Sequence, residues 1–521
     1  MWTETEVDSR VSPALPMRTV RRLWALALLA AGVPAAAQTP CTDGAVEADG
    51  LSFACEGVGL HARLTPQEIG APAFEGCPLR ACLNDLWGWT DPDTGREYAL
   101  VGMANGTAFV DVTQPDAPRR LGVLPTATSS NTWRDVKTYG HHAYVVSEAG
   151  GHGLQVFDLR RLRGLDEDPR RRFEADARLT DFGSAHNVVV DEAGGRLHAV
   201  GGACGDGLLT YTLEDPAAPA LAGCSGGTGY LHDAQCVVYA GPDPDYAGRN
   251  VCVGFRGDSV FFLDATLPAA ARLIATGFYP GSDYAHQGWL SEDHRYLLVD
   301  DEGDEGVTTA QTRTIVFDVE DLDDPEFVGF YLNPSTTTYD HNLYIREGYA
   351  FQANYNNGLR ILDLADIATA KLEEVAFFDT FPGSPDGVQD PFDGAWSVYP
   401  FFESGTLVVS DQIYGLFVLQ PEPGVVVADA ARPGVPAGVA LAVPALARGA
   451  ATVTLTAPAG ERVRLGLYDL RGRALGVVYD GAATGAAQTF TLGAEARAAG
   501  AVIVRAEAAS GHLARRVTFV R

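Results

Sequence analysis

The chain has 521 residues, 46% of them hydrophobic and 20% charged, which is the composition of a globular protein with room for more than one domain. Its formal net charge is −29 at pH 7, and the segment from Pro444 onward contains ten arginines against five acidic residues, so the acidic excess lies before that position. An acidic surface excludes nucleic acids and anionic membranes as expected partners, because both repel negative charge.

The N-terminus predicts a targeting segment. Three arginines between residues 18 and 22 precede an apolar run at 23–33, and alanines at 35–37 provide the small residues of a cleavage site. This order is typical of a secretory signal peptide, and the apolar run is too short for a permanent transmembrane helix. We assign residues 1–37 to the signal peptide, with Met17 as an alternative start, and expect no transmembrane segment elsewhere.

Export agrees with the cysteines, which number eight and can therefore all be oxidised in pairs. Although 105 pairings are formally possible, we expect pairs between near neighbours in the sequence. These pairs are Cys41–Cys55, Cys77–Cys82, Cys204–Cys224 and Cys236–Cys252. A zinc site is the alternative, but the sequence has no CxxC motif and the cysteines do not cluster.

Seven similar β-rich cores recur along the chain, about 45–57 residues apart. They are TAFVDV (107–112), LQVFDL (154–159), LLTYTL (208–213), VFFLDA (260–265), TIVFDV (314–319), LRILDL (359–364) and GLFVLQ (415–420). A repeat of this period, with several short strands per unit and no helical periodicity, predicts an all-β protein with a seven-bladed propeller over 41–420. The last unit shows three strands before Pro421, and strand 58–64 is expected to supply the fourth and close the ring.

The region after the propeller has two parts. Residues 421–444 are rich in proline, glycine, alanine and valine, and this composition predicts a linker. Residues 445–521 are arginine-rich, free of cysteine and composed of alternating strands. We expect this last part to be a small β-sandwich.

Histidines occupy one phase of the repeat. In a propeller the start of each blade's first strand lines the central channel, and the loop after the second strand opens on the same face. The seven first-strand starts are Asn84-Asp85, Arg134-Asp135, His186-Asn187, His232-Asp233, His286-Gln287, His341-Asn342 and Gly394-Ala395. Further ionisable residues expected at this face are Asp135, Glu148, His152, Asp300, Asp301 and Glu302. The sequence therefore predicts a funnel that holds four imidazoles with carboxylates near its rim.

Two interpretations of His186, His232, His286 and His341 stay open at this point. Four neutral imidazoles around one axis can bind a transition metal such as copper, zinc or iron, with nearby carboxylates orienting the rings or completing the ligand set. Alternatively, each imidazole bonds to the neighbouring blade and locks the ring. The repetition of the phase alone favours neither interpretation.

Two acidic segments are candidates for calcium. DPDTGRE (91–97) has Asp-x-Asp-x-Gly spacing, although it also occupies a position where a hairpin turn is needed, and DDEGDE (300–305) is a dense acidic loop. Signals for a nucleophile are missing, because the sequence has no GxSxG motif and no cysteine flanked by activating residues. We therefore assign no catalytic residue.

Several stretches resemble the choice-of-anchor B family, whose propeller blades carry the LVIVD-type repeat. They include NDLWGWTDPDTGREYALVG (84–102), HDAQCVVYAGPDPDY (232–246), YAHQGWL (284–290) and QANYNNGLRILDL (352–364). The resemblance covers roughly residues 41–420 and implies an exported propeller joined to a variable C-terminal sorting or anchoring module. It implies no known reaction.

The C-terminal part resembles a type IX secretion sorting domain. RVRLGLYDLRGRAL (462–475), VIVRAEA (502–508) and RRVTFVR (515–521) fit that pattern, whereas VPALARG (443–449) replaces its usual Pro-Asn-Pro opening. The resemblance implies recognition by the secretion machinery, followed by release from the cell or retention at its outer surface.

We therefore expect a secreted or cell-surface propeller that binds an extracellular protein or a small ligand through its funnel face. The alternative is a metal-dependent hydrolase or oxidase that uses the ring of histidines. The cofactor is undetermined, with a transition metal in the funnel and calcium in an acidic loop as the candidates.

Overall fold

The structure, a computed structural model, describes residues 38–423 with gaps at 74–75, 78, 80, 206, 227–228, 308–310, 385–386 and 388–389. Beyond them it describes residues 425, 440–442, 446–448, 451–469, 474–492, 501–508 and 511–520. The predicted signal peptide and most of the predicted linker therefore lie outside the described residues. Within the described ranges, no helix is long and apolar enough to cross a membrane.

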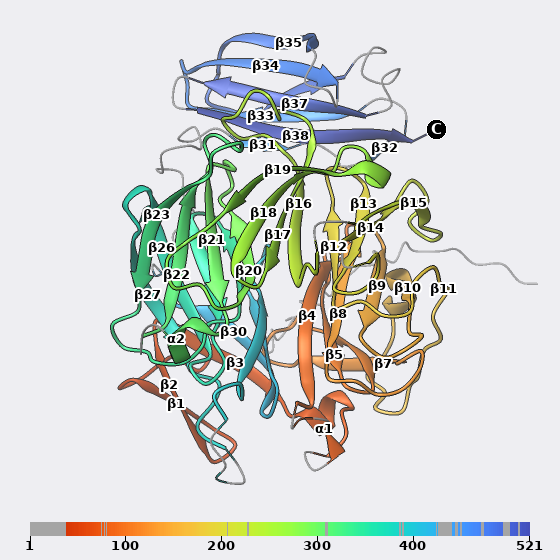
Figure 1. The fold of residues 1–521 in the computed structure, drawn as a ribbon, viewed down its shortest axis with the longest axis vertical. Coiled ribbons are helices and arrows are strands. Elements are labelled where there is room, and N and C mark those ends of the chain that lie inside the picture. Colours follow the sequence, from red (N-terminus) through yellow and green to blue (C-terminus); the bar gives the residue numbers. More distant parts are fainter. Residues whose placement is uncertain are drawn as a thin grey trace, which may run out of the picture. The chain divides into compact units, whose positions relative to one another are not determined.

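The described strands between residues 38 and 421 form antiparallel sheets, and Figure 1 shows their strands side by side. The first sheet consists of β4 (Leu83–Thr90), β5 (Glu97–Met103), β6 (Gly106–Asp111) and β7 (Arg119–Pro125). The second consists of β8 (Arg134–Tyr139), β9 (His142–Ser147), β10 (Leu154–Asp158) and β11 (Ala177–Leu179). The third consists of β12 (Asn187–Asp191), β13 (Arg196–Val200), β14 (Leu208–Thr212) and β15 (Ala220–Ser225).

Four more sheets of this kind follow in the described residues. The fourth consists of β16 (Asp233–Val238), β17 (Asn250–Arg256), β18 (Ser259–Asp264) and β19 (Arg272–Gly277). The fifth consists of β20 (Ala285–Leu290), β21 (Tyr296–Asp301), β22 (Arg313–Asp318) and β23 (Glu326–Leu332). The sixth consists of β24 (Asn342–Arg346), β25 (Tyr349–Ala353), β26 (Leu359–Asp366) and β27 (Lys371–Phe378), extended by β2 (Leu51–Glu56) and β1 (Ala45–Ala48). The seventh consists of β28 (Ala395–Tyr399), β29 (Leu407–Asp411), β30 (Gly415–Pro421) and β3 (Val58–Leu64).

The described helices are single turns. They are α1 (Pro66–Ile69), η3 (Leu159–Leu162), η4 (Pro268–Ala270), α2 (Asp304–Val307) and η5 (Ile367–Thr369).

A repeated turn explains why the core motifs align in the sequence. In five sheets an aspartate at or near the end of the third strand accepts a hydrogen bond at its Oδ1 from the backbone N–H two residues later, over 2.7–3.1 Å. These aspartates are Asp111, Asp158, Asp264, Asp318 and Asp363. Such a bond competes with the strand ladder and turns the chain toward the next element.

The first strands of the sheets form a closed ring. Strands β4, β8, β12, β16, β20, β24 and β28 each contact the next one, and β28 in turn contacts β4. A four-stranded sheet buries both faces only when other sheets cover them, and β6, with all six residues buried, lies inside such a stack. The closed ring of sheets is the arrangement of a β-propeller.

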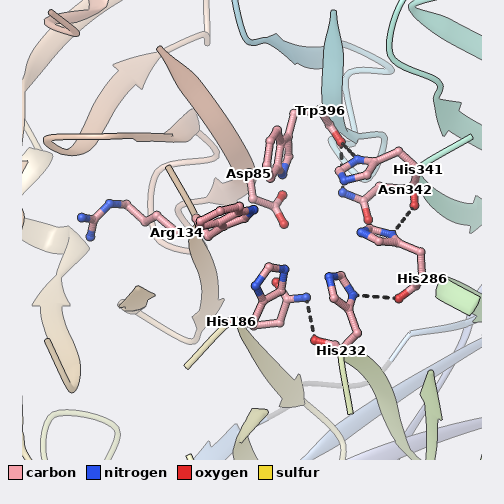
Figure 2. Close-up of a pocket in the computed structure, with 10 residues that line it drawn as sticks. Asp85, Arg134, His186, His232, His286, His341, Asn342 and Trp396 are labelled. Carbon is pink, nitrogen blue, oxygen red and sulfur yellow. Dashed lines mark hydrogen bonds between the residues drawn. The ribbon is translucent and has the colours of Figure 1, made fainter. Parts of the chain in front are cut away.

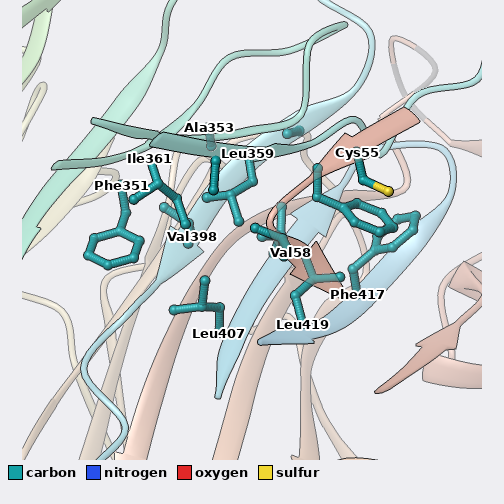
Figure 3. Packing of buried hydrophobic residues seen from close by; sticks show 14 of the residues in the cluster. Cys55, Val58, Phe351, Ala353, Leu359, Ile361, Val398, Leu407, Phe417 and Leu419 are labelled. Carbon is teal, nitrogen blue, oxygen red and sulfur yellow. The ribbon is translucent and has the colours of Figure 1, made fainter. Parts of the chain in front are cut away.

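The N-terminal segment belongs to this core. Strand β3 pairs antiparallel with β30, so the seventh sheet joins the two ends of the propeller sequence. Figure 3 shows the apolar side chains between the sixth and seventh sheets, which include Val58 of β3 and Cys55 of β2. Other members of this cluster are Phe351, Ala353, Leu359, Ile361, Val398, Leu407, Phe417 and Leu419.

The C-terminal part contains two further sheets in its described residues. One consists of β31 (Ala440–Ala442), β33 (Thr452–Thr456) and β36 (Gln488–Thr491). The other consists of β32 (Leu446–Arg448), β38 (Gly511–Val520), β37 (Ala501–Ala508), β34 (Arg462–Asp469) and β35 (Ala474–Ala482). Both contribute to one buried apolar cluster, with Leu455 from the first sheet and Val504 from the second.

A short strand of the C-terminal part begins before residue 445. Strand β31 begins at Ala440, inside the predicted linker, because the apolar segment there pairs with β33, with Ala440 opposite Thr456.

All eight cysteines are in disulfides. The pairs are Cys41–Cys55, Cys77–Cys82, Cys204–Cys224 and Cys236–Cys252, which confirms the local pairing expected from the sequence and removes the zinc alternative. Disulfides persist in oxidising compartments, so four of them agree with an extracellular protein.

Candidate functional site

The first strands of the ring start around one small pocket, which we call the funnel pocket. Its lining residues are Asp85, Trp133, Arg134, His186, Asn187, His232, His286, His341, Asn342 and Trp396. Figure 2 shows the four imidazoles facing the same space and the Arg134 side chain directed away from them. The pocket has a volume of about 10 Å³, which is close to the space that one water molecule needs. It therefore admits an ion or one small chemical group and is too small to enclose a whole organic substrate.

The four imidazoles form a continuous arc. Ring centroids are 4.2 Å apart for His186 and His232, 4.1 Å for His232 and His286, and 4.3 Å for His286 and His341. Tyr355 continues the arc, with its ring centroid 4.5 Å from that of His341. The arc exists because each histidine immediately precedes, or is the second residue of, an inner strand in four successive sheets.

Hydrogen bonds fix the tautomer of the rings. Nδ1 of His232 lies 3.0 Å from the carbonyl oxygen of His286, and Nδ1 of His286 lies 2.7 Å from that of His341. Nδ1 of His341 lies 2.6 Å from the carbonyl oxygen of Trp396, and these three bonds are among the dashed lines of Figure 2. Because a carbonyl oxygen only accepts hydrogen bonds, each Nδ1 carries the hydrogen and each Nε2 keeps its lone pair.

His186 closes the other end of the arc. Its Nδ1 lies 2.6 Å from Oε1 of Glu148, one of the carboxylates expected at this face. A carboxylate only accepts hydrogen bonds, so Nδ1 of His186 carries a hydrogen.

Burial keeps the three inner imidazoles neutral. It lowers the pKa of His232 and His286 well below the ordinary value, and the neighbouring imidazoles lower each pKa further. Burial also lowers the pKa of His341 to about 3. Neutral imidazoles with a free Nε2 are the form that binds metal ions.

Glu302 adds an anionic group to this set. Its Oε2 lies 3.8 Å from Nε2 of His286, while its Oε1 accepts a hydrogen bond from the Tyr355 hydroxyl. Burial raises the pKa of Glu302 to about 7. One ligand atom each from His286, His341 and Glu302 all lie within 4.8 Å of one another, a spacing that a single ion can bridge after small side-chain rotations.

Three other residues expected at this face have partners of their own. Oδ1 of Asp135 lies 2.6 Å from Nζ of Lys137, and the Asp301 carboxylate accepts hydrogen bonds from the Tyr279 hydroxyl and from three backbone N–H groups. Nε2 of His152 lies 3.0 Å from Nη1 of Arg134, and Nδ1 of His152 donates to a backbone carbonyl. These three side chains therefore form hydrogen bonds within the protein and stabilise the fold.

Asp300 is buried and sits apart from the histidines. Its Oδ1 accepts a hydrogen bond of 3.0 Å from Nε2 of Gln352. Burial raises the pKa of Asp300 to about 7, while bonds to Asp340 and Gln352 act in the opposite direction.

Sequence reasoning missed three contributors to the site. Trp133 and Trp396 line the funnel pocket, and Tyr355 holds Glu302. Both tryptophans are adjacent in the sequence to a predicted strand start, and this position could have identified them. Nothing in the sequence pairs residue 355 with residue 302, because that contact joins the fifth and sixth sheets.

The candidate calcium segment 91–97 forms the turn between β4 and β5. Nε and Nη2 of Arg163 lie 2.7 Å and 2.6 Å from the Asp91 carboxylate, and Nη2 also lies 2.8 Å from Asp93. His141 completes a group with these two aspartates. The guanidinium already neutralises the carboxylates, which disfavours a cation there.

Comparisons with known proteins identify neither a family nor a function for this chain. No family model matches the chain, no curated protein matches it, and the resemblance to the choice-of-anchor B family stays a prediction. Among solved structures, the chain is similar to the Cps50 (Swd1) β-propeller domain of Myceliophteria thermophila at 12% identity and a TM-score of 0.41, over 62% of this chain and 93% of that one. It is also similar to PorZ, a surface component of the type IX secretion system of Porphyromonas gingivalis, at 12% identity and a TM-score of 0.41. That match covers 84% of this chain and 59% of PorZ. Similarity this low establishes no function.

Proposed function

We propose that this chain is an exported β-propeller whose funnel binds a transition-metal ion and, through that ion, an extracellular ligand. The observation that carries the proposal is the set of buried imidazoles whose Nδ1 atoms are all occupied, which leaves the Nε2 lone pairs toward one ion-sized space. Nitrogen and carboxylate donors of this kind suit zinc, copper, iron and nickel.

His286, His341 and Glu302 are the proposed metal ligands within the ring of four histidines, because their ligand atoms lie closest together in the described residues. A set of three protein ligands leaves a coordination position open, as catalytic and ligand-binding metal sites do. The ligand of the funnel is then a molecule that offers a donor atom, such as a carboxylate or an amine, at the end of a group narrow enough to enter.

His186 and His232 continue the arc and support it. The close contacts between the tilted rings and the bond from His232 to the next sheet hold the proposed ligands in place. The histidines therefore bond to the neighbouring sheet through Nδ1, as one interpretation of the sequence proposed, and are free to bind a metal ion through Nε2, as the other proposed.

The remainder of the proposal concerns architecture and delivery. Seven first strands, each in contact with the next around a closed ring, support a seven-bladed propeller of the LVIVD type closed by strand 58–64. Two C-terminal sheets with one shared core support a β-sandwich, which we assign to sorting or anchoring at the cell surface. The four disulfides support delivery to the cell exterior after removal of residues 1–37.

A metal-dependent enzyme, either a hydrolase or an oxidase, is the second candidate. The observation that favours it is the close grouping of His286, His341 and Glu302, because a set of three nitrogen and carboxylate ligands is typical of catalytic metal sites. The small pocket restricts such an enzyme to a reacting group that projects from a larger molecule.

Metal content tests the proposal. Protein purified without chelator is dialysed against Zn²⁺ or Co²⁺ and the bound metal is measured by mass spectrometry, for the wild type and for His286→Ala and His341→Ala. We expect about one equivalent in the wild type and loss of it in both variants. His141→Ala is the matched control, because it removes the histidine of the only other described group that combines histidine with carboxylates. Absence of stoichiometric metal, or equal metal in all four proteins, contradicts the proposal.

A further inference from the structure

Aromatic side chains border the arc of imidazoles. They occupy one position of the repeat, two residues before the start of the first strand, in the fourth to seventh sheets. Three of them are partly buried, and Phe392 is 44% exposed. We call this set the aromatic rim, and its members are Tyr230, Tyr284, Tyr339 and Phe392.

Two residues of the aromatic rim lie against the middle of the arc. The ring centroid of Tyr284 is 5.3 Å from that of His232 and 6.3 Å from that of His286. The ring centroid of Tyr230 is 6.5 Å from that of His232. Because Tyr284 is only partly buried, a molecule whose end enters the funnel pocket meets this ring.

The other two residues of the aromatic rim lie beyond the last ring of the arc. Phe392 stacks on Tyr339, with 4.9 Å between the ring centroids and 10° between the planes. Phe392 also meets Tyr355 edge-on, with 5.5 Å between the centroids. The exposed part of Phe392 is a flat apolar surface, on which a flat apolar face of a ligand can stack.

The funnel pocket also contains a carboxyl group. Asp85 lines the pocket, and Figure 2 shows its carboxyl directed into the space that the imidazoles face. Its Oδ1 accepts a hydrogen bond of 2.7 Å from the backbone N–H of Leu86, and its Oδ2 lies 3.9 Å from Nζ of Lys137. A carboxylate has about four acceptor positions, so Asp85 can also bond to a group that enters the pocket.

Asp85 discriminates among the groups that can bind a metal ion. Burial raises the pKa of Asp85 to about 7, while Lys137 acts in the opposite direction. The carboxyl is therefore partly ionised at neutral pH and repels an entering carboxylate. An amine is protonated at that pH and offers no lone pair to an ion. A hydroxyl suits both forms of Asp85, because it donates to a carboxylate and accepts from a carboxylic acid.

Charge near the aromatic rim narrows the ligand further. Burial, and after it the carboxylates of Glu302 and Glu148, raise the pKa of Tyr284 to about 12, so negative charge lies close to this ring. The whole chain has a formal net charge of −29. Anionic ligands are therefore repelled. A neutral sugar matches the remaining requirements, because its C–H faces are apolar and its edges carry hydroxyl groups.

We propose that the ligand of the funnel is a neutral carbohydrate. One hydroxyl enters the funnel pocket and bonds to Asp85, while the sugar rings stack on the aromatic rim. The contact between this hydroxyl and a metal ion rests on the proposed function, whereas the stacking and the bond to Asp85 need no metal. A basic peptide is the alternative ligand, because an acidic surface attracts it.

Glycan binding tests the inference on the full chain. Labelled protein, either loaded with Co²⁺ or stripped with a chelator, is applied to an array of neutral and acidic glycans, and isothermal titration measures the affinity for the best of them. Pentalysine is titrated in parallel. We expect the Co²⁺ form to bind neutral glycans, the stripped form to bind them more weakly, and neither form to bind acidic glycans or pentalysine.

Variants locate the sugar on the protein. Phe392→Ala and Tyr339→Ala each remove one stacking surface, so the glycan affinity should fall roughly 2- to 10-fold with unchanged Co²⁺ content. Asp85→Ala should lower it roughly 10- to 100-fold, because it removes a hydrogen bond to an ionisable group. Phe278→Ala is the matched control and should bind as the wild type does, since Phe278 is 64% exposed and follows the outer strand β19.

Three results would overturn the inference. One is Co²⁺-loaded protein that binds no neutral glycan. Another is equal glycan affinity in the wild type, Phe392→Ala and Tyr339→Ala, which also decides the matter if Asp85→Ala does not fold. The third is binding of pentalysine in place of a glycan. All three leave the proposed metal site intact if Co²⁺ is bound, whereas a protein that binds neutral glycans without any metal would refute the metal and support the sugar.

Discussion

Nδ1 of His232 donates a hydrogen bond of 3.0 Å to the backbone carbonyl of His286, across the boundary between the fourth and fifth sheets. The same bond recurs one sheet further, from His286 to His341. Each of these side chains therefore clamps the next sheet with one ring nitrogen and presents the other to the funnel pocket. The structural and metal-binding interpretations of the histidines are compatible with each other.

His232→Ala separates these two roles. We expect the variant to lose about 2–4 kcal/mol of unfolding free energy, because it removes a buried hydrogen bond and a buried ring. We also expect it to retain about one equivalent of Co²⁺, since His232 is outside the three-ligand set. Urea denaturation and metal analysis of the same preparation measure both quantities. A variant that loses its metal at unchanged stability would make His232 a ligand.

Tyr355→Phe tests the carboxylate of the proposed centre. The Tyr355 hydroxyl donates to Glu302 and so orients its other oxygen toward His286. Removing the hydroxyl should weaken Co²⁺ binding by roughly 10- to 100-fold, as the loss of such supporting bonds does elsewhere, with little change in melting temperature. Competition with a chromophoric chelator measures the affinity. Unchanged affinity in Tyr355→Phe and in Glu302→Gln would exclude Glu302 from the site.

The sequence predicted the repeating architecture better than the chemistry. Period and strand pattern located the first strands, and the spacing of near-neighbour cysteines predicted all four disulfides. The four histidines were found because they share one phase of the repeat. Their tautomers were not predictable, because these depend on backbone carbonyls of the adjacent sheet, such as that of Trp396.

Non-local contacts account for the other misses. The bond between Tyr355 and Glu302 joins residues 53 positions apart, and no spacing rule connects them. The acidic segment 300–305 was a candidate for calcium, whereas the carboxyl of its first residue, Asp300, accepts a hydrogen bond from Gln352 of the sixth sheet. The start of β31 at Ala440 was missed because alanine-rich and proline-rich segments have linker composition whether or not they find a strand partner.

A pH-dependent loss of stability should come from His198. This side chain is fully buried, and burial lowers its pKa to about 3, with Arg196 lowering it further. The unfolded chain has a histidine pKa near 6.5, so as the pH falls below about 6.5 the unfolded state binds a proton that the folded state refuses. Stability is then lost toward pH 3, at up to about 1.4 kcal/mol per pH unit from this residue.

His198→Asn checks this effect, because asparagine can keep the bond to Thr210 without an ionisable ring. The variant should be less stable than the wild type at pH 8, and the difference should shrink steadily between pH 6.5 and pH 4. Denaturation curves across that range measure it. Parallel losses in the two proteins would contradict the assignment to His198.

Truncation after residue 423 tests the domain assignment. No described strand of the propeller comes from beyond Pro421, so the shortened protein should keep a cooperative thermal transition close to that of the full chain. If the C-terminal part is a sorting domain, the truncated protein should also fail to reach the cell surface when expressed in a host with type IX secretion. Loss of the transition would show that the C-terminal sheets are needed for folding, and normal surface delivery would remove the sorting role.

The location of the metal is the most direct test of the account. Crystals of the full chain grown with Zn²⁺ are measured on both sides of the zinc absorption edge, and anomalous difference maps locate the ion. We predict a peak in the funnel pocket at about 2.0–2.2 Å from Nε2 of His286, Nε2 of His341 and a carboxylate oxygen of Glu302. An empty funnel, or a peak at Asp91, Asp93 and His141, would contradict it.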